Sequence, residues 1–133
     1  MLALAEQRGY EEITLIGAEG DLLDHVLGNL YSAARSKLRI RFALRRGLAF
    51  VIRGGESRQF QGLHDARLSV MPLTPCSGVN LLGAEWPLTN AQISPLGLIS
   101  LSNRASDAVT VNLADGVAVV FLAHPDLEQP VWT

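Results

Sequence analysis

Hydrophobic residues follow two different spacings along the chain, and the spacing changes about a third of the way along. Residues 2–8 predict the end of a helix that stops at Gly9. The apolar run 13–16 predicts a strand of the parallel type, covered on both faces. A second helix is predicted to begin at Gly20 or Asp21, because apolar residues then recur every three or four positions. The buried stripe of this helix is expected to consist of Leu23, Val26, Leu27, Leu30 and Ala34.

The second part of the chain has a period of two, which is typical of half-exposed strands. Ile40, Phe42 and Leu44 alternate with Arg39, Arg41 and Ala43. An Asp-Gly pair at 115–116, between two apolar runs, predicts a β-hairpin. Further strands are expected at 48–52, 67–71, 79–82, 98–101, 109–113 and 117–122.

These patterns predict an α+β fold in two parts. Residues 1–39 are expected to be the remnant of an α/β (strand–helix) domain, whose sheet is expected to start before Met1. Residues 40–133 are expected to form a mostly antiparallel β-sandwich. A chain of 133 residues provides for one domain, or for one small domain and a piece of another.

Charge and composition exclude several classes of function. The formal net charge of -2 excludes a broad electrostatic footprint for nucleic acid. No apolar run reaches about 18 residues, so no membrane span is expected. The N-terminus lacks the basic start of a signal peptide, so a cytoplasmic location is expected. Cys76 is the only cysteine, and His25, His64 and His124 are too scattered for a zinc motif, so no metal site is predicted.

Basic residues crowd into one segment, namely Arg35, Lys37, Arg39, Arg41, Arg45 and Arg46. One interpretation is a solvated strand face, because runs of charge usually face water. The other is an edge that contacts phosphate groups. The sequence alone leaves both interpretations open.

A first polar cluster lies where the predicted strand 13–16 gives way to a helix. Asp21 can cap this helix, and Asp24 suits the positive end of the helix dipole. His25 and Asn29 are then ordinary exposed residues. Alternatively, a carboxylate, an imidazole and an amide within one or two turns hold a polar ligand, since α/β folds usually bind ligands at such turns.

A second polar cluster combines Trp86 with Ser102 and Asn103. Trp86 can be plain packing, or a flat platform for a ring or a cation. Ser102 and Asn103 can form a local turn, or present hydrogen-bond donors and acceptors to the edge of a heterocycle. The chain has no Walker loop, no dinucleotide-binding glycine motif and no serine nucleophile elbow.

Together these segments resemble thiamine pyrophosphokinase (thiamine diphosphokinase). Members carry a strand followed by Gly-Ala-x-Gly-Gly-Arg-x-Asp-His-x-x-x-Asn, which matches Gly17 to Asn29 here. The family's Gly-x-x-Trp/Tyr-x-Leu segment matches Gly83 to Leu88, and its Ser-Asn pair matches Ser102-Asn103. Order and spacing agree from Leu4 to Leu122.

The resemblance implies a two-domain homodimer that transfers pyrophosphate from ATP to thiamine, giving thiamine diphosphate and AMP. It implies that the α/β domain is catalytic and binds ATP and Mg²⁺, and that the sandwich (40–133) helps to form the thiamine pocket at the dimer interface. It also implies that Trp86 stacks on cationic thiamine and that Ser102 and Asn103 bond the aminopyrimidine. Asp24, His25 and Asn29 would line the catalytic cleft.

Two departures from the family pattern keep alternatives open. Asp21 and Leu22 replace a glycine and the arginine of the motif, which removes a phosphate contact. The upstream acidic motifs for magnesium are absent, so the chain is expected to be a C-terminal portion that is inactive alone and needs no cofactor of its own. The alternatives are a non-catalytic binding or dimerisation sandwich derived from that family, and an unrelated sandwich for small ligands.

Overall fold

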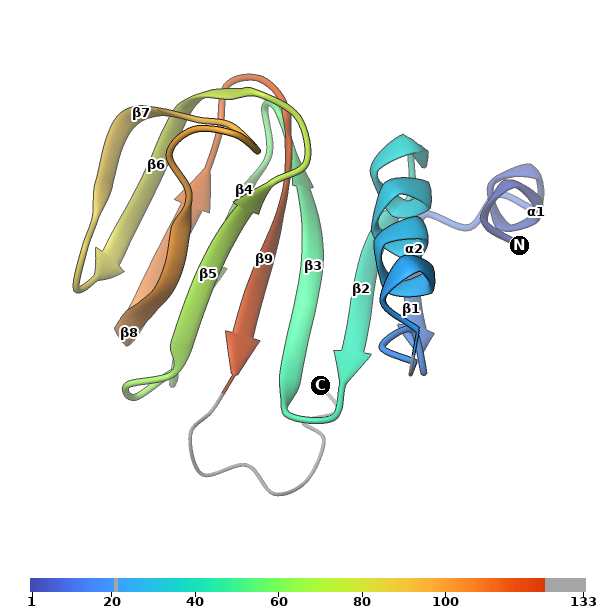
Figure 1. Ribbon diagram of the computed structural model, residues 1–133, viewed down its shortest axis with the longest axis horizontal. Helices are drawn as coiled ribbons and strands as arrows, with labels where there is room; N and C mark the ends of the chain where they lie inside the picture. Colours follow the sequence, from blue (N-terminus) through green and yellow to red (C-terminus); the bar gives the residue numbers. More distant parts are fainter. Residues whose placement is uncertain (21, 124–133) are drawn as a thin grey trace.

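A computed structural model describes residues 1–20 and 22–123 (Figure 1). It contains two helices and nine strands within these residues. Their order is α1 (Leu2–Gln7), β1 (Glu12–Ile16), α2 (Leu23–Arg35), β2 (Arg39–Leu44), β3 (Gly47–Arg53), β4 (Ser57–Phe60), β5 (Arg67–Pro72), β6 (Cys76–Ala84), β7 (Leu88–Ile93), β8 (Ser100–Asn112) and β9 (Val117–Ala123). No described helix is long and apolar enough to cross a membrane.

The strands form two layers that share β8. The first layer has the order β1-β2-β3-β9-β5-β8, and the second layer consists of β4, β8, β6 and β7. The first half of β8 pairs with β5, around Arg67↔Arg104, and its second half pairs with β4 and β6. The layers are therefore connected through the backbone of one strand as well as through their side chains.

Strand β1 runs parallel to β2, and every other pairing between named strands is antiparallel. The predicted fold class, a strand–helix unit followed by a mostly antiparallel sandwich, is confirmed. Hydrogen bonding continues from β1 through β2 into β3, so one sheet crosses the predicted boundary between residues 39 and 40. That domain boundary stays a prediction.

Strands β3 and β9 are buried on both faces, which explains why they are nearly continuous apolar runs. Phe50 and Ile52 of β3 face the second layer and join the core between the layers. Ala49 and Val51 face the opposite way and pack in a second core beneath α2. Figure 1 shows α2 lying across the β1–β2 end of the first layer. A strand covered on both sides has no polar face, and so no period of two.

Two sequence predictions about the first segment are wrong, and so is one about a turn. Ile16 is 71% exposed and Leu23 is 75% exposed, so β1 is not covered on both faces and the predicted helical stripe is only partly buried. Leu27 of that stripe is also exposed, while Val26, Leu30 and Ala34 are half-buried. The helix begins at Leu23, and Asp21, its predicted cap, lies outside the described residues.

The third wrong prediction is the hairpin at Asp115–Gly116. Strands β8 and β9 do not pair with each other, and the turn carries the chain from one layer to the other. It packs against the start of β6, where Ser77 N donates to Asp115 O over 3.1 Å and Ala114 N donates to Ser77 O over 3.0 Å. The Asp-Gly signal correctly marks a tight turn, but it does not specify which strands pair.

One guanidinium connects the helix to the sandwich. Arg53, at the end of β3, donates to Ala33 O over 2.8 Å, to Leu38 O over 3.1 Å, and also to Ser36 O. These carbonyls belong to the C-terminal end of α2 and the turn after it, where backbone carbonyls lack helical partners. Burial lowers the pKa of the Arg53 guanidinium, and nearby Glu56 opposes that effect.

Helix α1 is fixed to the same turn by a carboxylate. Ser36 Oγ donates to Glu6 Oε1 over 2.5 Å, and Lys37 N donates to the same oxygen over 3.0 Å. The hydrogen bond from Ser36, followed by that from Lys37, lowers the pKa of the Glu6 carboxyl. The turn between α2 and β2 is therefore held from two sides.

Candidate functional site

The first predicted cluster lies on the β1–α2 turn. Gly17 and Gly20 adopt positive φ angles of 74° and 48°, which lets the chain turn sharply after β1. Asn29 Nδ2 donates to Ala18 O over 3.1 Å, so this amide holds the turn against α2. Asp24 and His25 lie exposed in the first turn of α2. Asn29 therefore has a structural partner, while Asp24 and His25 face solvent.

A small apolar cavity of about 210 Å³ lies beneath this turn. Its lining includes Asn29 but neither Asp24 nor His25. The other lining residues are Ala18, Glu19, Val26, Leu30, Phe42, Leu44, Ala49 and Phe121. The three predicted catalytic residues thus share one helix, but only Asn29 lines this cavity.

The second predicted cluster is organised by the buried amide of Asn103. This residue is 2% exposed, and its Oδ1 accepts from Trp86 N over 3.1 Å and from Arg104 N over 2.8 Å. Its Nδ2 donates to Trp86 O over 2.7 Å and to Ser100 Oγ over 3.3 Å. Both hydrogens of the amide nitrogen are used inside the protein. Asn103 thus clamps both backbone polar groups of Trp86.

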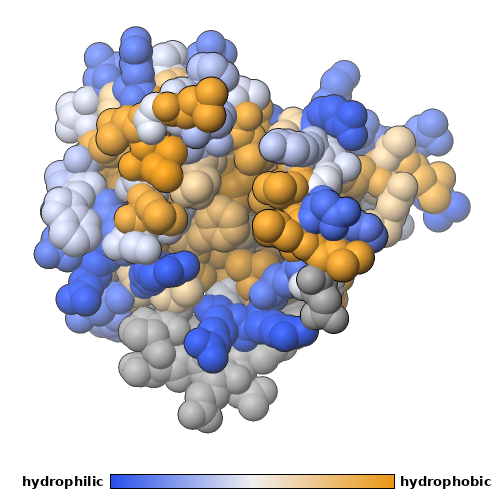
Figure 2. Space-filling view, viewed as in Figure 1, coloured by the Kyte–Doolittle hydropathy of each residue, from blue (hydrophilic) through white to orange (hydrophobic). Residues whose placement is uncertain are grey.

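The Trp86 side chain projects from this clamp. The residue lies in the turn between β6 and β7 and is 60% exposed, although tryptophans are highly buried on average. Leu82 and Leu101 are exposed as well. Figure 2 shows hydrophobic side chains on the surface of both the sandwich part and the helical part of the molecule. A large exposed ring on a fixed backbone suits contact with another molecule.

Ser102 has a strained backbone beside Asn103. Its φ angle is +54°, a region that residues with a Cβ rarely adopt. Its N–H donates to Ser69 Oγ over 3.0 Å, and its exposed hydroxyl lies 3.5 Å from Arg67 Nη1. Such strain persists only where the surroundings impose it, and it is concentrated at functional sites. The predicted ligand-contacting roles of Ser102, Asn103 and Trp86 stay predictions.

The two clusters lie far apart within the chain. Figure 1 shows the β6–β7 turn at one end of the longest axis and the β1–α2 turn in the other half of the molecule, below α2. Asp24, His25 and Asn29 therefore do not meet Trp86, Ser102 and Asn103 inside one copy.

Other catalytic groups are scarce in the described part of the chain. No three side chains of His, Cys, Asp or Glu come together there as a metal site would need. Cys76 is buried, and desolvation raises the pKa of its thiol, which disfavours the reactive thiolate. Burial therefore makes Cys76 a poor nucleophile.

Comparison with known proteins finds that the segment containing the second cluster is similar to a family domain. Residues 61–118 match the sequence profile described as "Thiamin pyrophosphokinase, vitamin B1 binding domain". That segment contains Trp86, Ser102 and Asn103. A search of curated proteins gave no match.

Solved structures share the fold over almost the whole chain. Thiamine pyrophosphokinase from Bacillus subtilis superposes with a TM-score of 0.79 at 21% identity, covering 95% of this chain and 61% of that one. A thiamin pyrophosphokinase family protein from Enterococcus faecalis gives 0.75 at 25% identity, with coverages of 92% and 60%. Thiamin pyrophosphokinase from Geobacillus thermodenitrificans gives 0.74 at 25%, with coverages of 94% and 60%. The chain thus spans about 60% of the length of these structures.

Proposed function

We propose that the chain carries the vitamin B1-binding domain of the thiamin pyrophosphokinase family, whose profile residues 61–118 match, and that Trp86 is the thiamine-binding platform. The observation that carries the proposal is the exposed indole on a backbone clamped by Asn103. Thiamine contains a cationic thiazolium ring and a flat aminopyrimidine. An indole face attracts a cation by about 0.5–2 kcal/mol, depending on desolvation.

The clamp gives Asn103 a positioning role in this proposal. Its Oδ1 and Nδ2 bond Trp86 N and Trp86 O, so the backbone that carries the indole is held before ligand arrives. A fixed backbone loses less conformational entropy on binding than a mobile one. Ser102, exposed and strained next to Asn103, is the residue whose hydroxyl reaches the ligand edge.

We further propose that the whole protein transfers pyrophosphate from ATP to the thiamine hydroxyl, with Asp24, His25 and Asn29 on the catalytic side. Because the two clusters lie in opposite halves of one copy, we place the proposed site between two copies, with one turn from each. ATP and Mg²⁺ belong to the whole enzyme in this proposal. Among the described residues, no three side chains of His, Cys, Asp or Glu lie together as ligands for the metal.

Calorimetric titration with thiamine tests the platform. We expect weak binding by this chain, and a loss of about twofold or more on Trp86→Ala, the lower end of the cation–aromatic range. Tyr31→Ala is the matched control, because Tyr31 is an exposed aromatic residue on α2, away from the clamp. Thiamine binding that is equally strong in wild type and Trp86→Ala would refute the role of Trp86.

A second candidate function is a binding or dimerisation module without catalysis. Leu22, where the family motif carries arginine, favours it, because a phosphate contact is lost. An assay of AMP release distinguishes the two candidates. The longest natural form of the protein is supplied with ATP, Mg²⁺ and thiamine, and AMP formed from ATP is measured. We expect no release by this chain alone, and a dimeric mass by light scattering. A monomeric mass across micromolar concentrations would count against the shared site.

A further inference from the structure

A step between the two layers leaves part of the first layer uncovered. Strands β1 and β2 extend the first layer beyond β4, which pairs with β8 at the border of the second layer. Arg39 and Arg41 lie on the same side of β2, since they are two positions apart, and Arg41 faces Phe50 across the β2–β3 pair. This face of the first layer lines the core between the layers at β3, but at β2 the second layer does not cover it.

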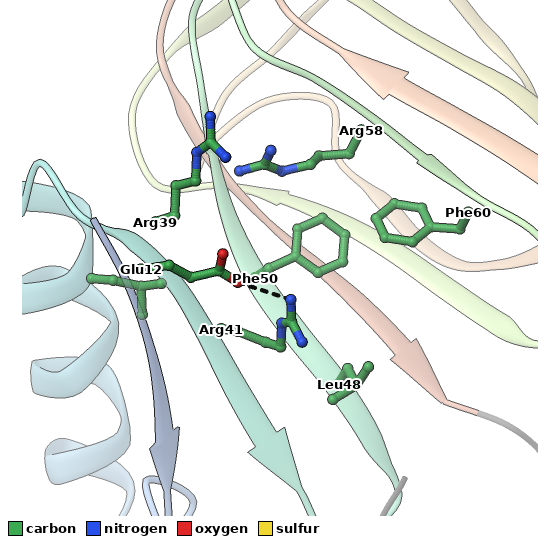
Figure 3. A pocket seen from close by; sticks show the side chains of 8 residues that line it. Glu12, Arg39, Arg41, Leu48, Phe50, Arg58 and Phe60 are labelled. Carbon is green, nitrogen blue, oxygen red and sulfur yellow. Dashed lines mark hydrogen bonds and ion pairs between the residues drawn. The ribbon is translucent and has the colours of Figure 1, made fainter. Parts of the chain in front are cut away.

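The step forms a cavity of about 400 Å³, which we call the arginine pocket (Figure 3). Its lining residues are Glu12, Arg39, Ile40, Arg41, Leu48, Phe50, Arg58 and Phe60. They come from β1, β2, β3 and β4, whereas the Trp86 cluster comes from the β6–β7 turn and β8. The arginine pocket is thus separate from the proposed thiamine site.

Positive charge dominates the arginine pocket. Three arginines line it against one carboxylate, Glu12, which pairs with Arg41 over 2.9 Å. Arg58 has a longer ion pair of 3.3 Å with Glu56, a residue outside the lining. Within the described part of the chain, no hydrogen bond or ion pair is seen for the side chain of Arg39. Figure 3 shows the guanidinium groups of Arg39 and Arg58 pointing toward one another.

Two like charges that face each other repel, and an anion between them removes the repulsion. The planar guanidinium group presents a fork of N–H donors that can bond two oxygens of one phosphate at once. Below the arginines, Phe50 and Phe60 pair with ring centroids 4.8 Å apart. The cavity is larger than one phosphate needs and lies within the usual range for small-ligand sites, about 300–1,000 Å³.

We propose that the arginine pocket binds a small organic phosphate, with the phosphate group between Arg39 and Arg58 and an apolar ring toward Phe60. This assigns a function to part of the basic segment recognised in the sequence. Only Arg39 and Arg41 of that segment line the pocket, and Arg58 joins them from a strand that the sequence analysis did not predict. The proposal does not depend on thiamine binding.

Calorimetry with phenyl phosphate and with inorganic phosphate, at low ionic strength, tests the proposal. Phenyl phosphate is expected to bind more tightly, because it supplies both the anion and the ring. Arg39→Met is expected to weaken phenyl phosphate binding about tenfold, the effect of losing one charge-assisted hydrogen bond. Arg39 is exposed, so its replacement leaves the fold intact, and circular dichroism checks this.

The matched control is Arg46→Met, which removes the same charge from the β2–β3 turn outside the pocket lining. Unchanged binding by Arg46→Met, with weakened binding by Arg39→Met and Arg58→Met, supports the proposal. Equal weakening by Arg39→Met and Arg46→Met would show a general charge effect and overturn it. Absence of phenyl phosphate binding at millimolar concentration would also overturn it, leaving the basic segment as a solvated strand face. Trp86→Ala should not alter phenyl phosphate binding.

Discussion

Replacing Arg53 with methionine should strongly destabilise the protein. The substitution keeps most of the side-chain volume and removes the guanidinium that donates to Ala33 O, Leu38 O and Ser36 O. A hydrogen bond to a charged group contributes about 1.5–3 kcal/mol when fully buried. Arg53 is half-buried and its three acceptors share one charge, so we expect a total loss of about 2–4 kcal/mol.

Urea unfolding followed by circular dichroism measures this loss. With a slope of about 1–3 kcal/mol per molar urea, the midpoint should fall by roughly 1–2 M. Arg46→Met is the control, because Arg46 is exposed in the β2–β3 turn, and surface changes usually stay within about 0.5 kcal/mol. Arg53→Lys keeps the charge but loses the several N–H donors of the guanidinium. Its urea midpoint should lie between those of Arg53→Met and Arg46→Met. Equal midpoints for Arg53→Met and Arg46→Met would refute the reasoning, since the carbonyls would then be satisfied by water.

Three further predictions concern the clamp, the N-terminal helix and a tight glycine. Asn103→Ala should lower the free energy of unfolding by about 1–3 kcal/mol, because polar backbone groups of Trp86 lose their partners; a urea midpoint equal to that of wild type would contradict this. The lowered pKa of Glu6 means that its carboxylate stabilises the fold fully above the ordinary pKa of 4.5, and that this contribution disappears as pH falls below 4.5 through the folded pKa. The stability difference between wild type and Glu6→Gln should therefore shrink in acid, and a pH-independent difference in urea titrations would argue against it. Gly83→Ala should destabilise more than Gly17→Ala, since both positions have positive φ but only the Cβ at 83 would meet a backbone oxygen, at 1.9 Å; equal thermal midpoints for the two variants would disprove the steric argument.

The sequence predicts those parts of the fold that depend on local pattern. The apolar runs of β3 and β9 identify buried strands, and the switch from helical to alternating spacing locates the end of α2. Pairing between distant strands has no such local signal. The Asp115–Gly116 turn looks like a hairpin because its local chemistry is the same whether the chain continues beside its neighbour or crosses to the other layer.

Side-chain partners were harder to predict than strands. The sequence points to both Trp86 and Asn103, but it does not indicate that the amide bonds the tryptophan backbone. Arg53 and Arg58 gave no signal, because an arginine at the end of a strand resembles any exposed charge until its neighbours are known. Leu23 is exposed although it belongs to the predicted apolar stripe. Helical spacing shows which residues share a face, but it does not show what covers that face.

The sharing of β8 has a consequence for how the molecule opens. Its first half is hydrogen-bonded to β5 and its second half to β4 and β6, so neither layer can slide over or peel from the other without breaking the backbone ladder of this strand. The amide hydrogens of β5 and β6 should consequently exchange with solvent through one common opening event. Asn103 lies on the same strand, so the backbone of Trp86 is anchored to the unit that opens in this single event.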